Sequence, residues 1–212
     1  MANSQPEETA ENPGRSPGNA GRGAGKRERL VTAARRVLYE QGVEKTTLAD
    51  IAAAADVPLG NVYYYFKTKD ALVSAVIESY QRSYGELSAE LDQQEGPVDR
   101  LKALVRALTS RRDLLASYGC PIGSLNMELD KREDALRTEA GTILAGVIDW
   151  AEAQFLAMGR PDARELAVAL IAAYEGIALL AATLRDPSLI SAEGDRLTRW
   201  IDSLNETRMT RQ

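Results

Sequence analysis

Between Lys45 and Lys69 the sequence concentrates hydroxyl, aromatic and basic side chains, which are the groups that bind nucleic acids. Val62 and Phe66 are four residues apart and share one helix face, which leaves most of the tyrosine run at 63–65 to point outward. Outward-facing groups of these types can reach phosphates and base edges. The residues that we expect to contact DNA are Lys45, Thr46, Thr47, Pro58, Leu59, Gly60, Asn61, Tyr63, Tyr64, Lys67 and Lys69.

Lys69 stands where a cation is electrostatically unfavourable. Thr68 is predicted to be the N-cap of a long helix. Lys69 then falls in the first turn of that helix, where the helix dipole favours an anion. A phosphate at that helix start would remove the conflict, because the backbone N–H groups and the ammonium could bind it together. The position therefore indicates a phosphate contact.

Two short helices joined by a tight turn are predicted to position these side chains. Thr47 is a good N-cap for the first helix, and Asp50 can reach back to its free N–H group. The alanines at 52–55 keep that helix thin, so that a second helix can cross it closely. Asp56 takes the turn, and Pro58 suits the first position of the second helix because its missing N–H is not needed there. Small residues at the start of this second helix favour entry into a major groove.

This stretch resembles the DNA-binding segment of the TetR family of bacterial transcriptional regulators. The matching residues are Thr47, Ile51, Ala52, Val57, Gly60, Val62, Tyr63, Tyr65, Phe66, Lys69 and Leu72. Pro58 and Leu59 depart from the family pattern, which usually has a small hydroxyl residue and often a polar one there, so no base preference is carried over. The resemblance implies an all-α fold, with an N-terminal three-helix helix-turn-helix head followed by a larger helical bundle for ligand binding and dimerisation.

The charge of the chain is divided unevenly. The 212 residues carry a net charge of −5, yet residues 22–69 hold nine basic and five acidic residues, a net of +4. A basic end on an acidic body is expected when only that end meets phosphate. The chain has no histidine and a single cysteine, Cys120. This excludes histidine-based acid/base chemistry, almost all zinc sites and an internal disulfide, so we expect no enzyme activity, metal or cofactor, and a cytoplasmic location.

The pattern divides the chain into four parts. Residues 1–25 read as a disordered lead-in, 26–70 as the DNA-binding head, 71–205 as the regulatory and dimerisation domain, and 206–212 as a tail. The helices predicted around the two short ones cover 26–41 and 68–91, then one that begins at Gly96-Pro97 and ends near Tyr118, a shorter one around 125–129, and three at 133–158, 166–184 and 191–204.

Residues 166–184 carry one charge, Glu175, in nineteen residues, so a membrane span must be considered. A central acidic residue disfavours a span, and we expect no membrane contact. A soluble helix covered on two faces explains the pattern better, with one stripe on its own core and the other against a second copy. The two stripes are Leu166, Leu170, Tyr174, Ile177 and Leu184, and Val168, Ile171, Ala178, Leu179 and Ala182. The resemblance implies that the last two helices, about 162–204, form the four-helix interface of a homodimer.

Aromatic, soft and polar residues among apolar neighbours are candidates for lining a ligand pocket in the body. They are Tyr118, Cys120, Leu125, Asn126, Met127, Trp150, Gln154, Tyr174 and Glu175. Glu175 needs a partner, because a carboxylate in an apolar helix is costly alone. Either an arginine of the body or of a dimer partner pairs with it, or a ligand donor does. Cys120 is a small core residue, a lining residue or a sensing thiol, although no flanking cation lowers its pKa.

We therefore expect a homodimeric transcriptional regulator that binds double-stranded DNA. The most direct form of this hypothesis is a repressor of a palindromic operator, released by a small-molecule effector in the helical body. Two alternatives stay open: a helical dimer that binds a small molecule or a protein partner without reading DNA, and a regulator that senses oxidants or electrophiles through Cys120. An all-helical enzyme is disfavoured by the lack of histidine and of any recognisable nucleophile–base pair.

Overall fold

The computed structural model describes residues 18–130 and 135–209, and side chains within 25–205 outside that gap. These residues form helices and no strands. The helices are α1 (Gly18–Gln41), α2 (Leu48–Ala54), α3 (Leu59–Tyr65), α4 (Lys69–Leu91), α5 (Pro97–Thr109), α6 (Arg112–Tyr118), α7 (Pro121–Leu129), α8 (Ala135–Ala157), α9 (Ala163–Leu184) and α10 (Ser188–Met209). The expected all-α fold is confirmed.

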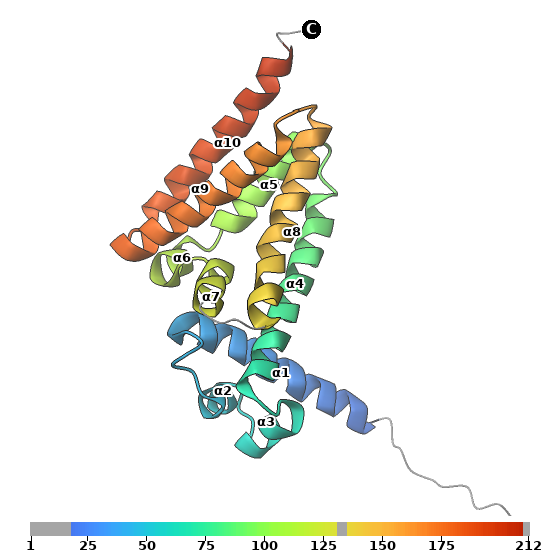
Figure 1. Ribbon diagram of the computed structural model, residues 1–212, viewed down its shortest axis with the longest axis vertical. Coiled ribbons are helices and arrows are strands. Elements are labelled where there is room, and N and C mark those ends of the chain that lie inside the picture. The colour runs from blue at the N-terminus through green and yellow to red at the C-terminus, as the bar shows by residue number, and fades with distance from the viewer. Residues whose placement is uncertain (1–17, 131–134, 210–212) are drawn as a thin grey trace, which may run out of the picture.

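The head consists of α1, α2 and α3, which lie at one end of the molecule against the lower part of α4 (Figure 1). The helix α1 begins at Gly18, inside the predicted lead-in, and α10 continues to Met209, into the predicted tail. Residues 1–17 and 210–212, the rest of those two predicted segments, lie outside the described residues.

One hydrophobic core joins the head to the base of the body. Leu30 and Ile51 of the head belong to the same buried cluster as Leu72 of α4, Leu129 of α7 and Ile143 of α8. The predicted boundary after residue 70 therefore does not separate two cores. Any tilt of the head must move residues that pack against α4, α7 and α8.

The helix predicted from Pro97 to about Tyr118 is two helices, α5 and α6. Thr109 and Ser110 each donate a side-chain hydrogen bond to a backbone carbonyl one turn earlier, over 2.8 Å in both cases. Such bonds compete with helix propagation, and Arg111 leaves the helical region with φ −101° and ψ 43°. The break turns α6 across the end of the body, beside α9 (Figure 1).

The helix α9 is the one helix in the described part of the chain that is long and apolar enough to cross a membrane, with a mean hydropathy of 2.0. Leu170 and Ala178 are fully buried against the core, whereas Leu179 and Leu180 are 66% and 51% exposed. One face of α9 packs on the core, as predicted, and the other is exposed, but the two faces differ in part from the two predicted stripes. From Leu166 to Leu184 the exposed residues are Val168, Ala169, Ala172, Gly176, Leu179, Leu180, Thr183 and Leu184, while Ile171 and Ala178 from the predicted outer stripe are buried.

Candidate functional site

The helix α3 presents aromatic and apolar side chains to solvent at the tip of the head. Leu59, Tyr63 and Tyr64 are 42%, 50% and 74% exposed, whereas Val62 is fully buried. Pro58 and Gly60 are also exposed and Asn61 is half-buried. The inward and outward faces of this helix are thus the predicted ones. Pro58 is the N-cap of α3, one position earlier than expected.

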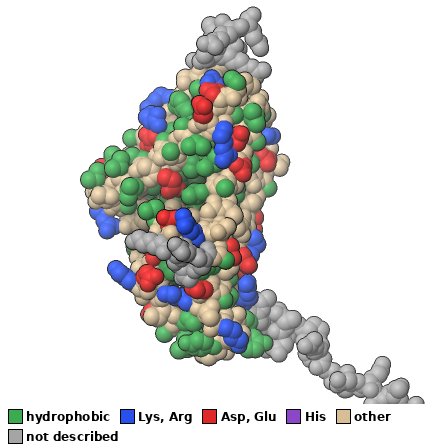
Figure 2. All heavy atoms as spheres, in the orientation of Figure 1, with side chains coloured by type: hydrophobic (Ala, Val, Ile, Leu, Met, Phe, Trp, Pro, Cys, Tyr) green, Lys and Arg blue, Asp and Glu red, His purple; other side chains and the backbone are tan. Residues whose placement is uncertain are grey.

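The turn between α2 and α3 brings these residues to the tip. Asp56 takes a left-handed conformation with φ +50°, and the Val57 N–H donates to the Ala52 carbonyl over 3.0 Å. The side chain of Val57 is then 5% exposed and returns to the core. Figure 2 shows hydrophobic and basic side chains at the foot of the head, where α3 lies.

Thr46 and Thr47 precede α2 but have different surroundings. Thr46 is 1% exposed and donates its hydroxyl to the Gly42 carbonyl over 2.7 Å, so the structure does not support the phosphate contact predicted for it. Thr47 is exposed and caps α2, accepting from the Asp50 N–H while its own N–H donates to Asp50 Oδ2 over 2.8 Å. The predicted capping box is confirmed.

The ammonium of Lys69 has protein partners rather than an open site. Its Nζ donates to the carbonyl of Val43 over 2.9 Å, of Thr46 over 3.3 Å and of Glu44 over 3.5 Å. These three carbonyls offset the unfavourable position of a cation at the start of α4. Lys69 therefore fixes the loop between α1 and α2, a role that sequence reasoning missed. Lys45 and Lys67 are exposed.

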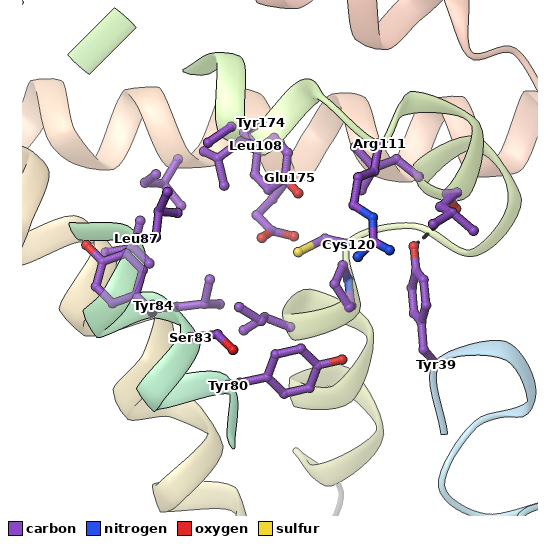
Figure 3. Close-up of a pocket in the computed structure, with 18 residues that line it drawn as sticks. Tyr39, Tyr80, Ser83, Tyr84, Leu87, Leu108, Arg111, Cys120, Tyr174 and Glu175 are labelled. Carbon is purple, nitrogen blue, oxygen red and sulfur yellow. Dashed lines mark hydrogen bonds between the residues drawn. The ribbon is translucent and has the colours of Figure 1, made fainter. Parts of the chain in front are cut away.

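The body contains a cavity of about 220 Å³ between α4, the α6–α7 segment and α9, and α1 reaches it through Tyr39 (Figure 3). Its wall is mostly apolar. The lining residues are Tyr39, Tyr80, Ser83, Tyr84, Leu87, Ala107, Leu108, Arg111, Leu114, Leu115, Cys120, Pro121, Ile122, Leu144, Val147, Ile171, Tyr174 and Glu175. Few convergent polar groups in a largely apolar hollow are typical of a small-molecule site.

Three of the predicted pocket residues lie in this wall: Cys120, Tyr174 and Glu175. The other six lie elsewhere in the fold. The ring of Tyr118 packs edge-on against that of Tyr39, with 5.3 Å between the ring centroids, and Met127 is 71% exposed. Leu125 belongs to the core shared by head and body, and Asn126 donates to the Ile122 and Ala140 carbonyls. Trp150 donates to Asp92, and Gln154 bonds to Arg100 and the Trp150 carbonyl.

Sequence reasoning missed all four residues that α4 supplies to the cavity wall. Tyr80, Ser83, Tyr84 and Leu87 follow one another at helical spacing and continue the inner stripe of that helix. This periodicity could have identified them. Tyr39 carried no such signal, because it lies on α1, which the sequence assigns to the head.

Glu175 has an unpartnered oxygen. Its Oε1 is buried and has no hydrogen-bond partner, and no ion pair joins the carboxylate to a described residue. Burial raises the pKa of this carboxyl, and a hydrogen bond with Cys120 opposes the rise. The predicted pairing with an arginine of the body is therefore not present among the described residues. Arg111 lines the same cavity but is exposed.

Cys120 is a buried thiol. It is 5% exposed, and its Sγ accepts from the Gly123 N–H over 3.4 Å. Burial and the charge of Glu175 raise its pKa to about 12. A thiolate is the reactive form, so these surroundings oppose the sensing role that the sequence left open. The structure instead assigns Cys120 to the cavity wall.

Polar contacts from α1 join the head to the wall of the cavity. The Tyr39 hydroxyl donates to the Gly119 carbonyl over 2.6 Å. Arg35 donates to Ser79 and Ser83 of α4, over 3.0 Å each, and lies over the ring of Tyr80. These residues connect α1 directly to the cavity wall.

An all-helical chain with a helix-turn-helix at its exposed tip defines a DNA-binding protein with a separate helical body. Residues 30–76 match the family model "Bacterial regulatory proteins, tetR family", and residues 97–194 match "Transcriptional regulator LmrA/YxaF-like, C-terminal domain". The chain belongs to the TetR family of bacterial transcriptional regulators and is not an enzyme.

Relatives extend over both parts of the chain. An HTH-type transcriptional regulator of Mycobacterium tuberculosis is 29% identical over 172 residues, 76% of this chain and 87% of that protein. The HTH-type transcriptional repressor DhaR of Mycobacterium sp. is 34% identical over 118 residues, 53% of this chain and 57% of DhaR. A TetR transcriptional regulator from Chloroflexus aurantiacus has a TM-score of 0.76 at 25% identity, covering 85% of this chain and 96% of that one.

Proposed function

We propose that this regulator is a homodimeric repressor that binds a palindromic operator and is released by a small molecule held in the cavity. The observation that carries the proposal is the place of Tyr39, which belongs to the DNA-binding head and yet lines the cavity of the body. A molecule that fills the cavity would touch the head directly. A ligand that prefers one head position shifts the population toward it.

Dimerisation is supported by the outer face of α9. Its exposed residues are uncharged from Val168 to Leu184, and Gly176 has open space beside it. Figure 2 shows hydrophobic side chains gathered on the left side of the body, where α9 ends and α10 begins (Figure 1). A contiguous apolar face of this kind is typical of a protein–protein interface. A dimer would present two copies of α3 to half-sites about 34 Å apart, or a multiple of that distance.

DNA contact is assigned to the α3 surface. The proposed contacts are Pro58, Leu59, Gly60, Asn61, Tyr63 and Tyr64, with Thr47, Lys45 and Lys67 against the flanking phosphates. None of these side chains is buried, although Asn61 is half-covered. A cytoplasmic location follows from the same proposal, since the operator is there. The relative DhaR carries the name of a transcriptional repressor, which favours repression over activation.

The test is binding of the purified protein to DNA from upstream of its own coding region, measured by fluorescence anisotropy across a salt series. We expect tight binding that weakens steeply with salt, because phosphate contacts release counterions. Tyr64→Ala should weaken it by about tenfold or more, since a specific contact contributes about 1–3 kcal/mol. Met127→Ala, equally exposed but on α7, is the matched control and should change nothing.

A random-sequence selection separates a displaced operator from a missing activity. If no duplex is enriched and the salt dependence is flat, the head does not read DNA. The helical dimer that binds only a small molecule or a protein partner would then be the better account.

A further inference from the structure

The cavity combines tyrosine walls with one carboxylate that has an unpartnered oxygen. We propose that its effector is a compact aromatic amine in the protonated form, with the ammonium bound by Glu175 and the ring held between the tyrosines. This inference rests on the proposed function, because it assigns the chemistry of the molecule that would release the DNA. A cavity of about 150 Å³ is enough to bind benzene, so about 220 Å³ admits a ring with a short substituent.

The carboxylate of Glu175 is held ready for a donor. Figure 3 shows it pointing from α9 toward Cys120 and the cavity. Gly123 makes this position possible, because a Cβ there would collide with Glu175 Oε2. The other oxygen, Oε1, accepts no hydrogen bond, and an unsatisfied buried acceptor lacks the interactions that water would give it. A ligand ammonium supplies both the missing donor and the missing charge.

Tyr39 and Tyr84 offer their rings to the cavity rather than free hydroxyls. The Tyr39 hydroxyl donates to the Leu114 and Gly119 carbonyls, and the Tyr84 hydroxyl donates to the Gly146 carbonyl over 3.3 Å. Burial raises the pKa of Tyr174 and Tyr84, so both stay neutral at physiological pH. Neutral aromatic faces attract a cation and stack against an aromatic ring.

Arg111 is the feature that could favour an anionic ligand instead. It lines the cavity, but it is exposed, and water can solvate its guanidinium without any ligand. The buried oxygen of Glu175 has no such alternative. The carboxylate of Glu175 is therefore the group that lacks a hydrogen-bond donor, and a cationic ligand would supply one.

The experiment compares three molecules of equal size and different charge by calorimetric titration of the DNA-free protein at pH 7.5. They are 3-phenylpropylamine, 3-phenylpropanol and 3-phenylpropionate. We expect the amine to bind more tightly than the alcohol by about tenfold or more, as for a hydrogen bond to a charged group, and the acid to bind weakest. Glu175→Gln should abolish this preference. Glu165→Gln, the same change on the exposed start of α9, should keep it.

Three results would overturn the proposal: no binding of the amine, equal or tighter binding of the alcohol or the acid, or a preference for the amine that survives in Glu175→Gln. Thermal melting of each variant confirms that it is folded before it is titrated. Operator release is measured separately. Release by the acid but not the amine would sustain the proposed function and reject the amine class, whereas amine binding through Glu175 without release would sustain the amine class and reject release.

Discussion

Glu175 places a carboxyl group in a mostly apolar cavity wall, and this lowers the stability of the folded protein. Burial raises the pKa of this group, which means that its ionised form is disfavoured in the folded state relative to the unfolded chain. The contribution of such a group is most favourable below its unfolded pKa and is lost as the pH rises through the folded value. The buried carboxyl of Glu175 therefore makes the folded protein less stable at neutral pH than it is at low pH.

We predict that Glu175→Gln stabilises the ligand-free protein at pH 7.5. Replacing this buried carboxyl, whose pKa burial raises, by a neutral amide removes the cost of ionising it. A gain of about 1 kcal/mol in unfolding free energy would raise Tm by about 2–4 °C for a chain of this size. The gain should shrink as the pH falls toward 4, where the wild-type carboxyl is protonated. Differential scanning calorimetry across this range measures it, with Glu165→Gln as the control. A variant that melts lower than wild type at pH 7.5 would contradict the account.

Among the helices and loops, the segment between α1 and α2 depends on one side chain from α4. Lys69 bonds to three of its carbonyls, while Val43 also donates its N–H to Glu128 of α7 over 2.6 Å. The loop sets the start of α2 and hence the orientation of α3. The sequence position of Lys69 predicted a phosphate contact, whereas in the structure this side chain positions the loop before α2.

We predict that Lys69→Ala lowers both stability and DNA affinity, because it leaves three loop carbonyls without their donor. The expected loss is about 1–3 kcal/mol of unfolding free energy, with faster hydrogen exchange in the loop. Lys67→Ala is the matched control: this exposed lysine should affect only DNA binding and reduce its salt dependence. An unchanged Tm in Lys69→Ala would show that the three carbonyl contacts do not support the loop.

For the whole molecule, we predict that two copies of the chain dimerise through the outer face of α9, which would hold their two heads together. Leu180 is 51% exposed on that face. Leu180→Glu should give a monomer in analytical ultracentrifugation and weaken operator binding, because two linked heads bind successive half-sites more tightly than one. Met127→Glu, exposed on α7, should remain a dimer. Dimerisation that survives in Leu180→Glu would move the interface away from the centre of this face.

Tyr39 connects the head to the cavity wall, so a change at this residue should separate ligand binding from DNA release. Tyr39→Phe keeps the ring in the cavity wall but removes the hydroxyl that bonds to Gly119. We expect ligand binding to change little, while the factor by which ligand weakens DNA binding falls by about fivefold or more, the scale of a typical coupling free energy. Anisotropy titrations with and without ligand measure this factor. Tyr118→Phe, on the neighbouring ring, should leave the factor as in wild type.

Local signals in the sequence were sufficient for the helix-turn-helix, although not for the start of α1, which lies at Gly18 rather than at residue 26. The N-caps at Thr47 and Thr68, the turn at Asp56 and the alternation of buried and exposed residues in α3 all depend on neighbours within about four positions. Helix periods also placed α4, α7, α8, α9 and α10 to within a few residues. The break at Arg111 was missed because Thr109 and Ser110 can sit in a helix or end one, and only packing decides between the two.

By itself, the sequence determined the class of the protein, its helix-turn-helix and the need of Glu175 for a partner. The tertiary structure alone decided which distant residues surround that carboxylate. Tyr39, Tyr84 and Glu175 are separated along the chain, and they meet only because α1, α4 and α9 converge on one cavity. It also decided that Lys69 binds loop carbonyls. The reason is physical: periodicity and capping are local, whereas burial and hydrogen-bond partners depend on how the helices pack.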